Sequence, residues 1–318
     1  MTEIPKILIT GGTGMLGSLL VETLRKKYGT QNVVCSDIRK TEGNPPEEPF
    51  ELCDITNFDQ LEGIVVKHGV TWLLNMSAVL SVAGEQNPQL AIKVNIGGFQ
   101  NLMEVARKHK IRIFSPSATA AFGPETPKEL TPDVTVMRPT NIYGVSKVHN
   151  ELVGEYYHRR FGVDFRCLRF PSIITGLGEG RGRVVDYIVE IFVEAVKSGR
   201  YTCDVDEHSR LPFLYLPDCV DGTVRFMETK RDKLKQSTYN VTALSITPSE
   251  IVTAIRKYYP EYQVDYKPDP VKMAIINSLP ESFDDSNARN DWQWDPKYNL
   301  DKIVIELLDI VKAKYCKC

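Results

Sequence analysis

The sequence predicts an α/β protein with a doubly wound parallel sheet and a smaller C-terminal lobe. Three observations predict this fold. Short apolar strands alternate with helix-like stretches through the first 170 residues, short connections join them, and the first strand leads into a glycine-rich turn. We divide the chain into residues 1–170 and 171–318, and expect some segments of the second part to return to the sheet. The second part would close over the carboxyl edge of the sheet, where ligands of open α/β sheets bind.

The expected strands of the first part are short buried runs, at residues 6–10, 33–37, 71–75, 111–115 and 165–170. Helices are expected between them, at residues 15–28, 58–67, 89–108 and 141–160. Strands and helices in this alternation form parallel pairs joined by right-handed crossovers.

The alternation becomes less regular beyond residue 170. A glycine-rich loop at residues 176–182 precedes an expected amphipathic helix at 186–197. We then expect strands at 213–216 and 239–242, a helix opened by residues 245–250, and a terminal helix from residue 300.

Composition excludes several classes of protein. The 318 residues are 42% hydrophobic and 25% charged with a net charge of −2, which is typical of a globular protein and gives no reason to expect a nucleic-acid partner. No apolar run is long enough to span a membrane, and the first strand begins too early for a secretory signal or an ordinary transit peptide. Seven cysteines and five histidines lack metal-ligand spacing, so we expect no metal, buried reduced thiols and a soluble intracellular protein.

The glycine turn after the first strand fits a dinucleotide-binding fingerprint. Gly11, Gly14 and Gly17, with Met15 and Leu16 between them, would let the backbone approach a pyrophosphate at the amino terminus of the next helix. A plain strand–helix turn fits the same glycines.

Asp37 favours the dinucleotide interpretation. It ends the second strand, where a carboxylate accepts hydrogen bonds from a ribose diol and repels a 2′-phosphate. The sequence therefore favours NAD over NADP. Arg39 is the opposing signal, because a nearby arginine accommodates that phosphate, although a solvated surface charge is the preferred interpretation.

Further cofactor contacts are expected along the same edge. Asp54 and Ile55 would meet the adenine, unless Asp54 caps a helix near Asn57. The residues after the third expected strand, Asn75, Ser77 and Ala78, would supply backbone contacts to the nicotinamide ribose. Asn95 would open the next helix by bonding to backbone or water, and is also expected to bind the cofactor. An exposed polar position on the helix is the alternative for Asn95.

Tyr143 and Lys147 are the candidate proton-transfer pair. Four residues apart on a helix, they lie on one face and can act on one substrate oxygen. A phenol titrates near pH ~10, and a cation within a few ångströms favours its ionised form. Ser117 or Thr119, after the fourth expected strand, would hold the substrate oxygen by hydrogen bonding. Chance spacing and strand-end turn chemistry are the alternatives.

These residues together resemble the extended short-chain dehydrogenase/reductases, the group that includes UDP-sugar 4-epimerases. The resemblance covers essentially the whole chain, although Ser115-Pro116 stands where the epimerases have a serine pair. Narrower patterns at residues 116–124, 210–219, 239–243 and 284–292 are similar to the short-chain type of L-threonine 3-dehydrogenase. The last of these is long and unusual, hence the most specific.

This resemblance implies a Rossmann-type fold and oxidation of the threonine C3 hydroxyl by NAD+. The product would be L-2-amino-3-ketobutyrate, which a ligase converts to glycine and acetyl-CoA. By the family's roles, Tyr143 takes the hydroxyl proton, Lys147 favours the ionised phenol and grips the nicotinamide ribose, and Ser117 orients the oxygen. A homodimer through the helices at 89–108 and 141–160 is also implied. Eukaryotic relatives are mitochondrial, so the cytoplasm and the mitochondrial matrix are both open.

The expected substrate contacts depart from the family at one point. Relatives carry Thr-Thr before the Asp-Tyr of the substrate helix, and this chain has Val184 and Val185 before Asp186. We expect Ser81 to bind the substrate carboxylate in place of the missing threonine. The alternative is that Ser81 caps a helix.

The stretch from Pro171 to residue 174 is expected to meet the carboxamide side of the nicotinamide and to gate closure. Arg169 and Thr175 flank it, and a core-edge strand with a charged exit is the alternative.

Two other functions remain open at this point. A nucleotide-sugar epimerase or dehydratase would need arginines such as Arg181 and Arg183 for a diphosphate. A non-catalytic NAD(H)-binding regulator would generally lack the tyrosine or the lysine, and both are present.

Overall fold

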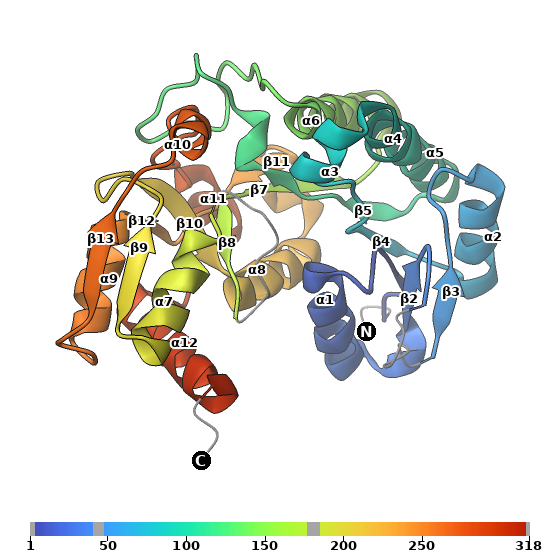
Figure 1. The fold of residues 1–318 in the computed structure, drawn as a ribbon. Helices are drawn as coiled ribbons and strands as arrows, with labels where there is room; N and C mark the ends of the chain where they lie inside the picture. Colours follow the sequence, from blue (N-terminus) through green and yellow to red (C-terminus); the bar gives the residue numbers. More distant parts are fainter. Residues whose placement is uncertain (1–3, 41–47, 177–184, 316–318) are drawn as a thin grey trace.

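The computed structural model describes residues 4–40, 48–176 and 185–315. Figure 1 shows two lobes side by side: a larger one built mainly from the first half of the chain, and a smaller one, yellow to red, built from the second half. The C-terminus lies at the smaller lobe.

The main sheet has the strand order β3-β2-β1-β4-β5-β7-β11, and all neighbouring strands in this order run parallel. The strands are β1 (Ile7–Thr10), β2 (Val33–Asp37), β3 (Phe50–Leu52), β4 (Trp72–Asn75), β5 (Arg112–Phe114), β7 (Phe165–Phe170) and β11 (Thr238–Asn240). A short strand, β6 (Ser117–Ala118), pairs with β7. The doubly wound parallel sheet is confirmed.

Helices cover both faces of this sheet. One face packs against α1 (Met15–Tyr28) and α8 (Leu216–Glu228), and the other against α2 (Phe58–His68), α5 (Phe99–His109) and α6 (Ile142–Phe161). Strands buried on both sides read as continuous apolar runs, which is why the sequence located them well. The order reverses at β1, with β2 on one side and β4 on the other. The carboxyl ends there form the point where such sheets bind ligands.

The expected single helix at 89–108 is wrong as one element. The structure has α3 (Ser81–Gln86), α4 (Pro88–Ala91), a π-helical stretch η2 (Ile92–Gly98) and then α5. The side chain of Asn95 bonds to the backbone of Val79 instead of lying on an exposed face. Asn95 thus meets backbone, as one of the two expectations had it, and it lies within the π-helical stretch; that Asn95 itself opens the helix stays a prediction.

The smaller lobe is built around a three-stranded sheet in the order β12-β10-β8. Its strands are β8 (Ser172–Ile174), β10 (Leu211–Tyr215) and β12 (Leu244–Ile246), with a separate parallel pair, β9 (Arg200–Cys203) and β13 (Gln263–Tyr266). The helices α7 (Tyr187–Lys197), α9 (Pro248–Arg256), α10 (Pro270–Ile276) and α12 (Leu300–Tyr315) pack on these strands around one apolar core.

Segments of the second half complete the larger lobe. The strand β11 pairs with β7 at the edge of the main sheet, and α8 packs against α1. The helix α11 (Ser286–Trp292) adds Trp292, which stacks with Phe226 and Trp294 beneath the sheet. The residue boundary at 170/171 stays a prediction.

Five cysteines are buried free thiols: Cys35, Cys53, Cys167, Cys203 and Cys219. Cys316 and Cys318 lie outside the described residues. Among the helices that the structure describes, none is long and apolar enough to cross a membrane.

Candidate active site

The glycine turn brings the backbone of β1 against the chain that follows β4. Gly11 has φ +67°, and a Cβ there would lie 2.7 Å from the backbone of Met76 and Ser77. A Cβ on Gly17 would lie 2.2 Å from the carbonyl oxygen of Gly11. Only glycine fits both positions, so the first turn of α1 sits directly over the strand end.

The amino terminus of α1 is open to an anion. Gly14 is the N-cap residue and supplies no side-chain cap, and the first turn, which begins at Met15 and Leu16, contains no acidic residue. The first N–H groups of a helix need an acceptor and carry the positive end of its dipole. This arrangement fits a pyrophosphate.

Asp37 ends β2 beside the turn. Its Oδ2 accepts from the hydroxyl of Thr13 at 2.6 Å and from the Thr13 N–H at 3.2 Å, and its Oδ1 accepts from the Ile38 N–H at 2.8 Å. The carboxylate is half-buried, and Arg39 is exposed two residues further on. Asp37 thus lies where the sequence analysis expected a ribose-binding group.

Asn75 ties three strand ends together instead of presenting its side chain at the surface. Its Oδ1 accepts from Thr10 at 2.9 Å and from the Ser77 N–H at 3.2 Å, while its Nδ2 donates to Ser115 at 3.2 Å. This tie fixes the path of Ser77 and Ala78, the half-buried residues whose backbone was expected to meet the nicotinamide ribose.

Tyr143 and Lys147 lie on one face of α6, as their spacing predicted. The Lys147 Nζ lies 5.2 Å from the centroid of the Tyr143 ring and donates to the Pro116 carbonyl oxygen at 2.7 Å. Lys147 is buried and Tyr143 is half-buried. The ammonium and the phenol ring therefore lie next to each other, beside the segment that follows β5.

Ser117 presents a hydroxyl that needs a partner. Its Oγ is buried and makes no hydrogen bond with the described residues, although buried polar groups are nearly always paired. Thr119, also buried, makes only a long 3.4 Å bond to the Phe170 carbonyl oxygen. A substrate oxygen would satisfy Ser117.

A chain of contacts links α6 to the chain after β4. Asn95 binds both backbone groups of Val79 and donates to Ser146 at 3.2 Å; Ser146 in turn donates to the Tyr143 carbonyl oxygen at 2.7 Å. The phenol is thereby positioned relative to the glycine turn, because Gly11 contacts the backbone just before Val79.

Asp54 and Ile55 hold local structure. Asp54 is exposed and accepts from the Thr56 N–H at 2.9 Å, whereas Asn57 is the residue that caps α2. Ile55 is a core side chain against Gly98. Any adenine contact from these two residues stays a prediction.

Arg169 faces the interior, so the alternative that its charge marks the exit of the chain from a core-edge strand is wrong. Its guanidinium bonds to Glu151 of α6 at 2.8–3.1 Å and to the Asp133 carbonyl oxygen at 2.7 Å. These contacts make Arg169 a structural residue. Pro171 and Thr175 are buried at either end of β8, and their contact with a nicotinamide stays a prediction.

The expected substrate residues approach from both lobes. Ser81 is exposed at the start of α3, where Leu80 is the N-cap and no side chain caps the helix. Val185 packs on the core of the smaller lobe, and Asp186 is buried at the start of α7. Residues 177–184, with Arg181, Arg183 and Val184, lie outside the described residues.

Sequence reasoning missed Thr13 and the Pro116 carbonyl. Thr13 lies inside the glycine pattern at a position that tolerates many residues, so only its contact with Asp37 reveals it. The Pro116 carbonyl carries no side-chain signal.

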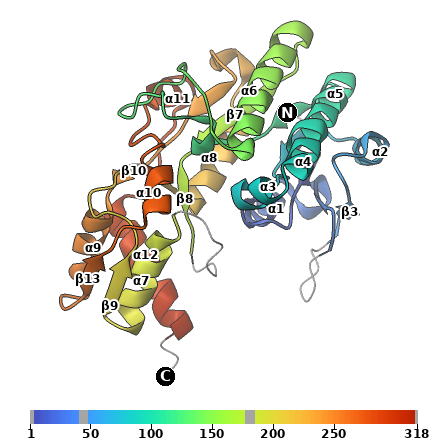
Figure 2. The same cartoon turned by 45° about the horizontal axis from the view of Figure 1, so that its top comes forward.

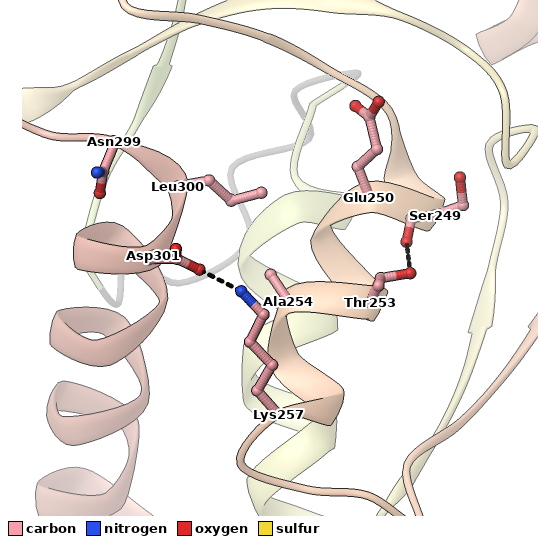
Figure 3. Close-up of a pocket in the computed structure, with 8 residues that line it drawn as sticks. All are labelled: Ser249, Glu250, Thr253, Ala254, Lys257, Asn299, Leu300 and Asp301. Atoms are coloured by element: carbon pink, nitrogen blue, oxygen red, sulfur yellow. Dashed lines mark hydrogen bonds and ion pairs between the residues drawn. The ribbon is translucent and has the colours of Figure 1, made fainter.

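A separate hollow of about 450 Å³ lies between α9 and the start of α12 in the smaller lobe. Figure 3 shows the ion pair between Lys257 and Asp301 crossing it, at 2.7 Å. None of its lining residues belongs to the site described above.

The glycine turn, the strand-end carboxylate and the Tyr–Lys pair define a dinucleotide-dependent oxidoreductase. Residues 7–242 match the NAD dependent epimerase/dehydratase family, and the chain belongs to that family.

Within the family, the chain is similar to L-threonine 3-dehydrogenases. It is 48% identical to the mitochondrial L-threonine 3-dehydrogenase of Bos taurus over 309 residues, which is 96% of this chain and 82% of that protein. The structure of L-threonine dehydrogenase from Clostridium difficile superposes with a TM-score of 0.94 at 39% identity, covering 98% of this chain and 99% of that one. That from Phytophthora infestans has a TM-score of 0.90 at 45% identity, with coverage of 96% and 98%.

Proposed function

We propose that this protein oxidises the C3 hydroxyl of L-threonine with NAD+ to give L-2-amino-3-ketobutyrate. The observation that carries the proposal is the Tyr143–Lys147 pair on one helix face. Its lysine bonds to the carbonyl oxygen just before Ser117, whose buried hydroxyl has no hydrogen-bond partner among the described residues. The similarity to threonine dehydrogenases over nearly the whole chain supports the substrate.

The residues present fit NAD. The uncapped start of α1 would hold the pyrophosphate, and Asp37 would accept from the adenosine ribose. When bound, NAD+ accepts the hydride released from C3.

The chain's own residues handle the proton and the orientation. Tyr143 removes the hydroxyl proton as a phenolate, which the Lys147 ammonium stabilises. Ser117 donates to the same substrate oxygen and so holds the C3–H bond in a fixed direction. Because the Ser117 hydroxyl is already buried, it donates without first giving up contacts to water.

Replacing Tyr143 tests the proposal. Tyr143→Phe removes only the hydroxyl, so threonine-dependent NADH formation should fall by roughly 10²–10⁴-fold, the usual contribution of acid–base catalysis. NADH binding, followed by fluorescence, should persist. Oxidation that continues at the wild-type rate would remove Tyr143 from the mechanism. Conversion of UDP-galactose to UDP-glucose, without oxidation of L-threonine, would point to a nucleotide-sugar enzyme.

We also propose a homodimer through α4, η2 and α6. Exposed apolar side chains gather there, at Leu90, Ile92, Val145, Leu152 and Tyr156. In Figure 2 the helices α4, α5 and α6 lie next to one another, and contacts join them. Light scattering that gives the mass of a single chain at micromolar concentration would contradict this proposal.

A further inference from the structure

The pairing of β1 with β2 places Thr13 against the Asp37 carboxylate. The two strands are parallel, with Thr10 opposite Ser36, and the turn after β1 bonds back to β2 through the Gly12 N–H and the Ser36 carbonyl oxygen at 2.8 Å. Thr13 therefore arrives one residue beyond Ser36, over Asp37.

The glycine turn lies in direct contact with the side chain of Cys35 in β2. A Cβ on Gly12 would lie 2.6 Å from the Sγ of Cys35, so the turn rests directly on β2. Burial raises the pKa of the Cys35 thiol to about 11, which keeps it a neutral packing group. The position of Thr13 is thus set by backbone contacts and does not depend on its own hydroxyl.

The hydroxyl of Thr13 fixes one oxygen of Asp37. Oδ2 receives two bonds from Thr13, at 2.6 Å from the hydroxyl and 3.2 Å from the N–H. Oδ1 receives the Ile38 N–H at 2.8 Å. A carboxylate has about four acceptor positions, so these three donors leave Oδ1 with one position free of them for a ribose hydroxyl.

We propose that Thr13 is a specificity-determining residue, which locks the Asp37 carboxylate in the orientation that accepts an adenosine ribose and repels a 2′-phosphate. Without the hydroxyl, Asp37 loses its shortest bond and keeps the backbone N–H bonds from Thr13 at 3.2 Å and Ile38 at 2.8 Å, so Oδ2 is held only weakly and the carboxylate rotates more easily about its side chain. The Asp37 carboxylate would then turn away from the ribose and repel a 2′-phosphate less. The exposed side chain of Arg39, two residues after Asp37, could then bind that phosphate.

This inference rests on the proposed use of NAD, and nucleotide binding tests both separately. Thr13→Val keeps the shape and removes the hydroxyl, and Thr13→Ser keeps the hydroxyl. Thr253→Val is a matched control, because it removes an exposed threonine hydroxyl that bonds to Ser249 within α9 of the smaller lobe (Figure 3). Dissociation constants for NADH and NADPH are measured by fluorescence for all four proteins, together with kcat and KM for NAD+.

We expect Thr13→Val to raise the Kd for NADH about five- to tenfold and to narrow the NADH/NADPH preference by about tenfold, a change of about 1.4 kcal/mol in relative binding. The kcat at saturating NAD+ should stay within about twofold of wild type, while Thr13→Ser and Thr253→Val keep the wild-type preference. A merely structural defect would lower both affinities and the melting temperature together.

Three outcomes overturn the inference: Thr13→Val with the wild-type preference, Thr13→Ser as impaired as Thr13→Val, or Thr13→Val with both affinities reduced equally. Should Thr13→Val not fold, Thr13→Ala carries the same test. Wild-type protein that binds NADPH as tightly as NADH overturns the proposed use of NAD instead.

Discussion

The buried ion pair between Arg169 and Glu151 gives the sharpest stability prediction. Both side chains are almost fully buried, with relative exposures of 4% and 2%, and three contacts of 2.8–3.1 Å join them. Burial alone would lower the pKa of Arg169, yet the Glu151 carboxylate holds it above its ordinary value. Arg169→Leu therefore leaves a charged carboxylate in the core with no cation.

Removing one partner of such a pair costs about 3–5 kcal/mol of unfolding free energy. For a chain of this size that corresponds to a fall in melting temperature of roughly 4–8 °C. Because Glu151 lies one helical turn after Lys147, the same change tests whether Arg169 gates the site. We expect kcat with L-threonine, measured well below the melting temperature, to stay within about threefold of wild type.

A double-mutant cycle completes the test. In the Arg169→Leu, Glu151→Leu double variant no charge is left unpaired, so it should be more stable than Arg169→Leu alone by about 2 kcal/mol. A melting temperature for Arg169→Leu within about 2 °C of wild type would refute the reasoning about the buried pair. A kcat that falls a hundredfold at full saturation would restore the gating role.

Two further predictions follow from close contacts and from charge. In Gly144→Ala the new Cβ would lie 2.0 Å from a backbone carbonyl oxygen of the short helix η3 (Thr119–Ala121). We therefore expect the free energy of unfolding to fall by about 2 kcal/mol and kcat to fall tenfold or more, as measured by thermal melting and steady-state kinetics. Wild-type values for both quantities would contradict this prediction. Hydrogen bonds from Lys67 and then His68 lower the pKa of Glu51, so its contribution exists above the unfolded-state pKa and disappears as the pH falls through the folded-state value. Urea unfolding should show wild type more stable than Glu51→Gln by at most about 1 kcal/mol at pH 7, with the difference shrinking as the pH falls below the ordinary range of a carboxyl group. A difference that grows towards acid pH would contradict this prediction.

The main sheet was predictable because its strands are buried on both faces. The bounds expected for β2 and β7 agree with the structure, and α1 begins and ends where expected. The bounds of β3 were not predicted, because this strand has three residues and only Phe50 is buried. The helix α8 was missed because it begins immediately after β10, with a proline in its first turn and no intervening loop.

The late pattern at residues 284–292 was read correctly as specific and for a reason that only the structure shows. Asn287 donates to Asp133 at 2.9 Å, and Asp291 accepts from the Tyr239 hydroxyl at 2.8 Å. Asp133 also accepts from the Asn240 N–H at 2.6 Å, so this segment holds β11 in place. These bonds join residues 52 to 154 positions apart, which no local pattern reveals.

Residue types and spacing predict a chemistry for the site but not its supporting contacts. Tyr143, Lys147 and Ser117 were predictable because proton transfer demands particular side chains. The bond from Lys147 to the Pro116 carbonyl and that from Thr13 to Asp37 depend on how two turns meet in space. They became visible only with the fold.

The late arrival of β11 has a consequence for biogenesis. The edge of β7 acquires its partner only after the chain has passed through much of the smaller lobe, so a nascent or truncated polypeptide ending before residue 238 would carry an open, apolar strand. Unpaired edges of this kind recruit other chains into aggregates. Distant pairings also form slowly. Folding in the cell would accordingly depend on shielding the open edge of β7 during translation. Truncated forms of the protein should precipitate before they fold.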